Sequence, residues 1–296
     1  MFYEAKGDSV QIARMYMDSL LVESRIVGAV RPDTTFRFLN ESFAMPIMTA
    51  ALSHLDLASM AEGARQAGAC VSIGMGGNEE MGSVLSTGAK VMKIIKPYAD
   101  GEEIFSRIAY AESNGAIAVG MDVEHAVNVD DAEDSTVMGL QMKQPTLAEL
   151  EGYIRSTKLP FFIKGALSVQ DALRCRDLGA AGLILSHHNG LMRYAVPPVM
   201  ILPEIRKAVG LDLILIADGG IESGFDAFKA LARGADAVTM GKALMAPLKE
   251  KGAEGVREAL TRAAGQLRAM MIRTGTKDLK HMDPSVIYEP AGYRHG

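Results

Sequence analysis

Short apolar runs alternate with amphipathic stretches eight times along this chain. The apolar runs lie at residues 45–51, 69–74, 90–97, 116–123, 159–165, 180–186, 211–217 and 235–240, and the helical patterns at 55–67, 78–86, 102–113, 146–156, 168–178, 199–209, 225–233 and 254–272. Runs that are apolar at consecutive positions predict parallel strands covered on both faces. Eight strand–helix units in about 250 residues predict one α/β domain folded as a (β/α)8 barrel. A doubly wound open sheet is the alternative, but no GxGxxG follows the first run.

Two segments lie outside this alternation. Residues 1–44 carry a helical pattern at 11–27, and we expect them to form an appendage that packs on the barrel and closes its bottom. Residues 124–144 form a polar stretch after the fourth strand, and a connection of that length predicts a lid over the catalytic face. The predicted division is therefore an appendage, a barrel over 45–280 and a C-terminal tail over 281–296.

The composition excludes several classes of protein. A net charge of −5 with no block of Lys or Arg argues against a nucleic-acid surface. No apolar run reaches the roughly 18 residues of a membrane span. The first residues lack a signal-peptide pattern, and Cys70 and Cys175 are far apart without CxxC spacing. We therefore expect a cytoplasmic enzyme with two reduced thiols.

Polar and ionisable residues end most of the predicted strands. In a barrel these positions point into the active site, at the carboxyl ends of the strands. Polar side chains gathered there in register predict a catalytic site rather than a structural surface. The residues are Ser72, Lys96, Asp122, Lys164, Ser186, His187, His188 and Asp218.

Glycines follow the last two strands, at Asp218-Gly219-Gly220 and Gly241-Lys242. Barrels bind phosphate at this place, because bare backbone N–H groups and a helix N-terminus face the anion. Lys242 adds a positive charge. Glycines that serve only tight turns are the alternative, but two such loops side by side favour a phosphate site.

His188, Asp122 and Lys164 form the second candidate group. If His188 meets Asp122, the carboxylate fixes the tautomer of the imidazole and raises its basicity, as proton abstraction requires. Lys164 ends a buried apolar strand, and its ammonium needs a partner there. A metal site from His125, His187 and His188 is disfavoured, because neighbouring strand residues point to opposite sides.

The motifs taken together resemble a known family. They are 162–165, 182–190, 202–205, 218–220 and 235–242, and the likeness extends from about residue 34 to 279. In this order they resemble the FMN-dependent α-hydroxy acid oxidases and dehydrogenases, which include lactate oxidase and glycolate oxidase. The resemblance implies bound FMN and oxidation of a small 2-hydroxy acid, or a related alcohol or amine, by hydride transfer to flavin N5.

The resemblance also implies roles for individual residues. His188 would be the active-site base, paired with Asp122. Lys164 would sit beside the pyrimidine end of the flavin. The remaining cofactor contacts would come from Ala50, Ala51, Ser72, Ser186, Asp218, Gly219, Gly220, Gly241 and Lys242.

The substrate-binding residues depart from the family pattern. The family clamps the substrate carboxylate with two arginines, but one position is Leu191 here and the segment 124–144 contains no arginine. An arginine of the Asp-Gly-Gly loop is replaced by Glu222. The family's strand-three tyrosine is replaced by Lys96. Candidate substrate contacts are therefore Lys96, Tyr98, His187 and Arg193.

Other functions fit parts of the pattern. An FMN-dependent isomerase of a phosphorylated substrate, similar to type 2 isopentenyl diphosphate isomerase, would keep the flavin. A nucleotide barrel similar to inosine monophosphate dehydrogenase would keep the phosphate loops, but its cysteine loop is missing. A non-catalytic binding barrel would leave the convergence of His188, Asp122 and Lys164 unexplained. The family resemblance further implies a small, anionic substrate and a homo-oligomer, commonly a tetramer.

Overall fold

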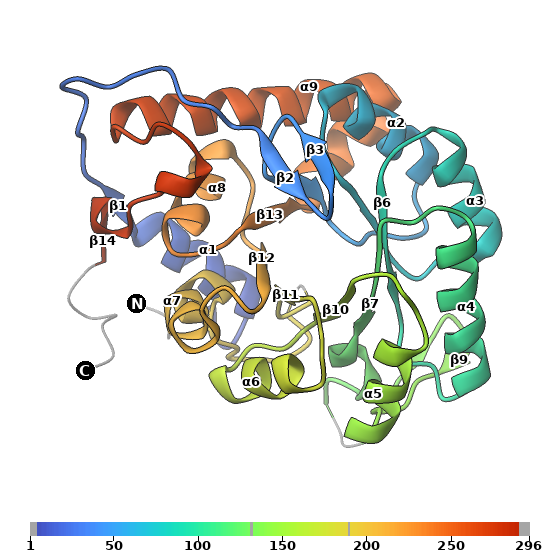
Figure 1. Cartoon of the computed structure of the whole chain (residues 1–296). Helices are drawn as coiled ribbons and strands as arrows, with labels where there is room; N and C mark the ends of the chain where they lie inside the picture. Colours follow the sequence, from blue (N-terminus) through green and yellow to red (C-terminus); the bar gives the residue numbers. More distant parts are fainter. Residues whose placement is uncertain (1–4, 131–132, 189, 290–296) are drawn as a thin grey trace.

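The fold is a barrel of eight parallel strands surrounded by helices (Figure 1). The computed structural model describes residues 5–130, 133–188 and 190–289. The strands run β4–β13–β12–β11–β10–β7–β6–β5 around the barrel. Their bounds are β4 Ile47–Thr49, β5 Val71–Ile73, β6 Val91–Ile95, β7 Ala118–Asp122, β10 Phe161–Lys164, β11 Gly182–Leu185, β12 Ile214–Asp218 and β13 Ala237–Met240.

The barrel closes between β4 and β5. The backbone N–H of Thr49 donates to the carbonyl of Cys70, and Leu52 forms a parallel bridge with Ile73. The hydroxyl of Thr49 also donates to the carbonyl of Ser72, at 3.0 Å. These bonds satisfy the edges of the first two strands, as closure of a barrel requires.

A helix follows each strand, as the alternation predicted. The outer helices are α2 Leu57–Ala67, α3 Asn78–Ser86, α4 Gly101–Ser113, α5 Leu147–Arg155, α6 Val169–Asp177, α7 Pro198–Val209, α8 Gly224–Ala232 and α9 Lys242–Arg273. All eight predicted strand–helix units and the (β/α)8 fold are confirmed. The last helix starts earlier than expected, because α9 continues through a kink at Gly252.

The N-terminal segment is divided between the two ends of the barrel. The hairpin of β2 Phe36–Phe38 and β3 Glu41–Phe43 packs its phenylalanines against the barrel interior, and the rings of Phe38 and Phe162 are 5.9 Å apart. This hairpin closes the bottom, as expected. The helix α1 Ser9–Ser19 does not, because it lies at the opposite, catalytic end beside β12 and α7 (Figure 1).

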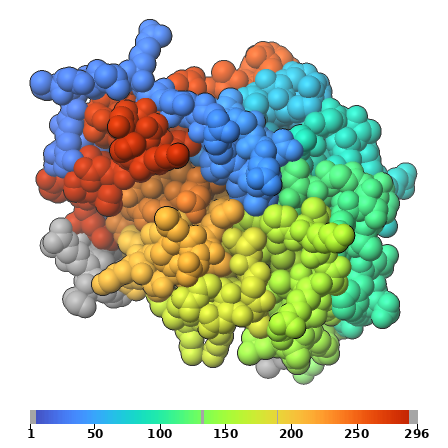
Figure 2. Space-filling view, in the orientation of Figure 1, coloured from blue at the N-terminus to red at the C-terminus, as the bar shows by residue number. Residues whose placement is uncertain are grey.

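Helix α1 is also shorter than the predicted 11–27. It ends at Ser19, and Leu21–Val22 (β1) pairs instead with Ile287–Tyr288 (β14) from the C-terminal segment. The two segments lie side by side in Figures 1 and 2. A pairing between residues so far apart in the chain ends a helix that the local pattern would continue.

The polar stretch after β7 leaves the carboxyl end of that strand and contains a short helix and a hairpin. It begins with the 3-10 helix Val123–Ala126 (η2) and continues into the hairpin of β8 Thr136–Val137 and β9 Leu140–Gln141. The hairpin is attached to the loop after β6, because the N–H of Ala99 donates to the carbonyl of Gln141. Residues 131–132 of the predicted lid lie outside the described residues.

Both cysteines, Cys70 and Cys175, are buried and free, which confirms the expectation of two unpaired thiols. In the described part of the chain we find no helix that combines the length and hydropathy needed to cross a membrane.

Candidate active site

A cavity of about 390 Å³ opens at the carboxyl ends of the barrel strands. Its volume lies in the range of small-molecule and cofactor sites. Ten of the residues selected from the sequence line it: Ala50, Ala51, Lys164, His187, His188, Asp218, Gly219, Gly220, Gly241 and Lys242. Residues chosen for their position at the strand ends therefore surround one cavity.

A network of charges lies at the wall of this cavity, with the buried carboxylate of Asp122 at its centre. Its Oδ2 atom lies 2.6 Å from Nδ1 of His188, 2.9 Å from Nζ of Lys96 and 3.3 Å from Nζ of Lys164. The other oxygen, Oδ1, is buried and has no partner among the described residues. One carboxylate thus organises two lysines and a histidine, each from a different strand end.

The charges in this network stabilise one another. Burial acts to raise the pKa of Asp122, but Lys164, the hydrogen bond from His188 and Lys96 together bring it well below its usual range. Burial acts to lower the pKa of Lys164, but Asp122 and the neighbouring carboxylates raise it above its usual value. For Lys96, burial outweighs Asp122 and lowers the pKa to about 8. Asp122 and Lys164 are therefore charged at neutral pH.

His188 is the residue in this network with the features of a base. Its Nδ1 lies 2.6 Å from Oδ2 of Asp122 and 2.8 Å from Nζ of Lys164. In the tautomer whose Nδ1–H donates to Asp122, Nε2 keeps a lone pair. Its backbone N–H donates to Oγ of Ser186 at 2.9 Å. Burial lowers the pKa of His188, against the opposing effect of the Asp122 hydrogen bond. The imidazole is therefore neutral at neutral pH and able to accept a proton.

The backbone of His188 corrects one expectation. His187 and His188 were expected to point to opposite sides of a strand, but both line the cavity. The strand β11 ends at Leu185, and His188 adopts a left-handed conformation with φ of 43°. A non-glycine residue in this region carries strain of the kind found at functional sites.

The opposite end of the cavity is formed by glycines and the N-terminus of a helix. Gly219 and Gly220 have φ of 100° and 74°, and Gly241 begins α9 without a side-chain cap. A Cβ atom on Gly241 would lie 3.0 Å from Cβ of Ala50, so a glycine is needed at this close approach. Open backbone N–H groups at a helix N-terminus, with Lys242 beside them, suit an anion.

Asp218 connects the two ends. The hydroxyls of Ser186 and Thr239 donate to its two carboxylate oxygens, at 2.9 and 2.6 Å. Nζ of Lys164 lies 3.9 Å from its Oδ2. Asp218 therefore ties strands β11, β12 and β13 together at the cavity wall.

Unpaired polar atoms at the site fit a bound cofactor. Both ring nitrogens of His187 and Oγ of Ser72 are buried without a partner in the described part of the protein. Buried polar groups are almost always paired, so these atoms indicate that a polar ligand completes the site. The glycine cradle, Lys164 at one end and Lys242 at the other fit the two ends of a flavin mononucleotide.

Six candidates do not line the cavity: Asp122, Ser72, Lys96, Ser186, Tyr98 and Arg193. Lys96 contacts Asp122 in the charge network, and Ser186 contacts Asp218. Oγ of Ser72 is buried without a partner among the described residues. Tyr98 is buried elsewhere and donates its hydroxyl to the carbonyl of Met75. Arg193 is exposed and donates to the carbonyl of Lys6. The structure therefore does not bring Tyr98 or Arg193 to the cavity.

Residues that the sequence analysis did not select also reach the site. Arg14 and Val10 of α1 and Glu222 line the cavity. The ring of His125 packs on the edge of His188 with centroids 4.1 Å apart. His125 is three residues after Asp122 in the sequence, so proximity could have signalled it. Nothing near Arg14 in the sequence indicated its place, because Gly220, whose carbonyl it contacts, is 206 residues away.

The fold and the site define a cofactor-binding barrel enzyme with a His–Asp pair at the strand ends. A model of the FMN-dependent dehydrogenase family matches residues 124–289, more than half of the chain. The chain therefore belongs to the FMN-dependent dehydrogenase family, and its cofactor is FMN.

Individual relatives agree with the family. The chain is 41% identical to an L-lactate oxidase of Alicycliphilus denitrificans over 144 residues, which are 48% of this chain and 40% of that protein. It is 39% identical to a 4-hydroxymandelate oxidase of Amycolatopsis orientalis over 135 residues, 45% of this chain and 38% of that protein. The chain thus spans about two fifths of the length of the curated relatives it matches.

A solved structure shows the likeness over nearly the whole fold. The crystal structure of a mandelate oxidase with (S)-2-phenylpropionate superposes with a TM-score of 0.85 at 25% identity, covering 95% of this chain and 89% of that one. The N-terminal part, which the family model does not match, therefore also belongs to the common barrel.

Proposed function

We propose that this protein is an FMN-dependent oxidoreductase that oxidises a small 2-hydroxy acid, or a related alcohol or amine. The observation that carries the proposal is the contact of 2.6 Å between Nδ1 of His188 and Oδ2 of Asp122 at the cavity wall. The likeness to lactate and hydroxymandelate oxidases supports the same class of substrate.

The His188–Asp122 pair supplies the proton chemistry. Asp122 holds the Nδ1–H tautomer, so Nε2 of His188 faces the cavity as an acceptor for the proton of a substrate hydroxyl or ammonium. When His188 becomes positively charged, the carboxylate of Asp122 stabilises the imidazolium. A positioned base of this kind contributes about 10²- to 10⁴-fold to the rate.

The cofactor contacts follow from the cavity wall. Gly219, Gly220, Gly241 and Lys242 would hold the phosphate, and Lys164 would place its ammonium beside the ring system, as proposed from the family resemblance. Ala50 and Ala51 would complete the cofactor wall. Asp218 would hold the wall in shape through Ser186, and Ser72 lies outside the cavity lining. When bound, FMN supplies the acceptor for the two electrons that the substrate loses.

The substrate end differs from a carboxylate clamp made of arginines. We propose His187 as the substrate contact that remains, whereas Lys96 acts from behind the wall through Asp122. His187 lines the cavity with two unpaired ring nitrogens, and the ammonium of Lys96 lies 2.9 Å from Asp122 behind the wall. A single lysine already paired with a carboxylate binds an anion more weakly than an arginine fork. A substrate with a weakly held or absent carboxylate is consistent with this site.

The test uses the purified full chain and its visible spectrum. We expect the purified protein to show flavin absorbance. In the absence of oxygen, one member of a panel of 2-hydroxy acids, their 2-amino counterparts and simple alcohols should bleach it. His188→Asn should keep the flavin but lose at least a hundredfold in the rate of bleaching. His281→Asn is the matched control, because His281 also contacts an aspartate at 2.6 Å, Asp278, but on the surface. A flavin that stays oxidised against the whole panel would contradict the proposed reaction.

We also propose that the protein forms a homo-oligomer in the cytoplasm. Leu21, Ile26, Val27 and Val30 expose 55–98% of their surface on the N-terminal segment, which suits an interface between copies. Two free buried thiols fit a reducing compartment. Light scattering of the full chain tests the assembly: a mass of about four chains is expected, and a monomer at all concentrations contradicts it.

A further inference from the structure

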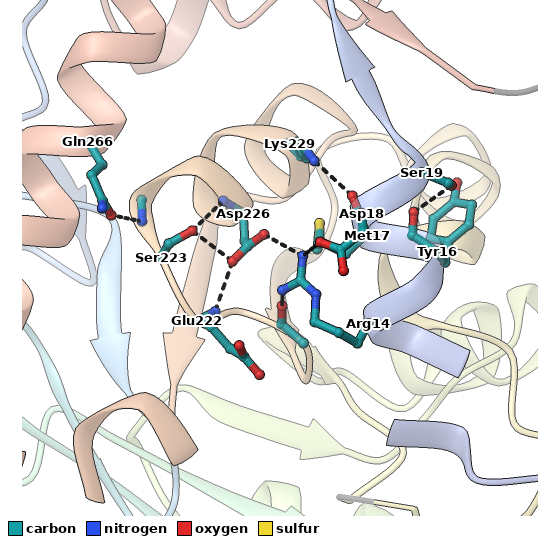
Figure 3. Close-up of polar contacts among 12 residues, drawn as sticks. Arg14, Tyr16, Met17, Asp18, Ser19, Glu222, Ser223, Asp226, Lys229 and Gln266 are labelled. Atoms are coloured by element: carbon teal, nitrogen blue, oxygen red, sulfur yellow. Dashed lines mark hydrogen bonds and ion pairs between the residues drawn. The ribbon is translucent and has the colours of Figure 1, made fainter. Parts of the chain in front are cut away.

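The N-terminal helix brings an arginine to the phosphate end of the cavity. Arg14 of α1 lines the cavity together with Gly219, Gly220 and Glu222. Its Nη1 donates to the carbonyl of Gly220 at 3.0 Å, and its Nη2 donates to Oδ1 of Asp226 at 2.9 Å (Figure 3). The guanidinium therefore lies directly against the loop between β12 and α8.

This loop brings a carboxylate to the phosphate end of the cavity. Glu222 lines the cavity, so the loop contributes a negative charge to its wall. A dianionic phosphate at this place needs cations around it. Lys242 supplies one from the start of α9, and Arg14 supplies another from a different part of the chain.

The hydrogen bonds of Arg14 leave room for a ligand. A guanidinium has five N–H groups. Three of them are used within the described part of the protein, by Gly220, Asp226 and Asp18. Nε–H and one N–H of Nη1 remain, on different sides of the guanidinium, and each can donate a charge-assisted hydrogen bond to a phosphate oxygen.

The surroundings hold the guanidinium in place. Asp226 is buried, and its second oxygen accepts from the backbone N–H of Glu222 and the hydroxyl of Ser223 (Figure 3). The same carboxylate thus fixes both the loop and Arg14. A side chain fixed before binding loses less entropy when a ligand arrives.

We propose that Arg14 binds the phosphate of FMN and offsets the negative charge that Glu222 brings to the β12–α8 loop. This inference rests on the proposed cofactor site and adds a cofactor-binding residue from the N-terminal helix. It explains why α1 lies at the catalytic end rather than at the bottom of the barrel.

A purely structural role for Arg14 can be separated from this one. The ammonium of Lys229 also fastens α1 to α8, by donating to the carbonyl of Met17 at 2.8 Å (Figure 3). Lys229 does not line the cavity. Lys229→Met therefore weakens the attachment of α1 without removing a cavity cation, and it is the matched control.

The experiment titrates the flavin-free full chain with FMN and with riboflavin, which lacks the phosphate, and follows flavin fluorescence. We expect Arg14→Gln to raise the Kd for FMN about tenfold or more and to leave the Kd for riboflavin within about twofold of wild type. Arg14→Lys should recover part of the FMN affinity, because lysine restores the positive charge but not the N–H groups of the planar guanidinium. Lys229→Met should not change the ratio of the two constants.

Equal changes in both constants for Arg14→Gln, or a loss of thermal stability with an unchanged ratio, would overturn the proposal. If the wild-type chain binds FMN no more tightly than riboflavin, the proposed phosphate end of the cofactor site is refuted. If wild type prefers FMN and Arg14→Gln keeps that preference, the cofactor site stands and only the role of Arg14 is wrong.

Discussion

Asp122 and Lys164 are in register on neighbouring strands, and Nζ of Lys164 lies 3.3 Å from Oδ2 of Asp122. Both side chains are buried at the catalytic end of the barrel. Register therefore decides that this lysine meets this carboxylate, and the same carboxylate orients His188. The charge of the cofactor site and the basicity of the active-site histidine are coupled through one residue.

Replacing Asp122 by Asn should damage both activity and stability. The amide keeps the shape but leaves Lys96 without its carboxylate and removes the acceptor that holds the His188 tautomer. We expect the rate of substrate-dependent flavin reduction to fall about 10²- to 10⁴-fold. The free energy of unfolding should fall by about 3 kcal/mol, because a buried pair is broken from one side. Stopped-flow absorbance and urea unfolding measure the two effects. Asp278→Asn, at a surface His–Asp contact, should show neither.

The rate should depend on pH through His188. A base must be neutral to accept a proton, and burial lowers the pKa of His188 from 6.5. We therefore expect kcat/KM to rise with pH through a midpoint below 6.5 and then to level off. The rate profile from pH 4.5 to 7.5 checks this. A profile that falls with rising pH in this range would show that the reactive form is the imidazolium.

Glu124 should make the folded protein less stable as pH rises, whereas the rate that depends on His188 rises with pH. Burial raises the pKa of Glu124 from 4.5 to about 8, against the attraction of Lys164. The folded state binds the proton more tightly, so this stabilisation is complete below pH 4.5 and is lost as pH rises towards 8. Glu124→Gln imitates the protonated form and should exceed wild type in stability by about 2 kcal/mol at pH 9 but not at pH 4.5. Urea unfolding of both flavin-free chains measures the difference, and a constant difference across pH would refute the assignment.

Removing the negative charge at position 222 should tighten FMN binding. Glu222 lines the phosphate end of the cavity, so its carboxylate repels the phosphate. We expect Glu222→Gln to lower the Kd for FMN about three- to tenfold, with riboflavin unaffected. Glu204→Gln changes the net charge equally on the exposed face of α7 and serves as the control. An equal response of the two variants would mean that only overall charge matters.

Lys93 should hold the loop after β5. Its buried ammonium donates to the carbonyls of Gly74 and Gly76, each at 2.5 Å. Lys93→Met leaves two carbonyls without this donor and should cost about 2–4 kcal/mol of unfolding free energy. Lys90→Met removes only an exposed ion pair with Glu41 and should cost about 1 kcal/mol or less. Thermal unfolding of both variants measures the two losses of stability. Equal losses for Lys93→Met and Lys90→Met would contradict the prediction.

Local sequence pattern was sufficient for the barrel. Each strand lies within its predicted apolar run or extends one residue past it, as β12 does at Asp218. Glycines between helix and strand, such as Gly68 and Gly179, adopt the left-handed φ that is common where a helix ends. These features depend on neighbours in the chain, so a sequence shows them directly.

Contacts between distant segments were harder to predict. The pattern extended the first helix to Val27, whereas pairing of Leu21 and Val22 with the C-terminal segment ends it at Ser19. Tyr98 and Arg193 have suitable chemistry at suitable positions, but their side chains are bound by Met75 and Lys6 instead. Side-chain direction depends on packing that no local pattern encodes.

The sequence by itself determined the barrel, the end of it that carries the chemistry, and the His188, Asp122 and Lys164 group, because strand period and strand-end position are local properties. Only the tertiary structure decided that Arg14 reaches the phosphate loop and that His187 and His188 share one cavity. The position of Arg14 depends on how α1 packs against a loop far along the chain, since Gly220 is 206 residues away. The shared cavity of the two histidines depends on a left-handed backbone at His188, which the surrounding fold imposes.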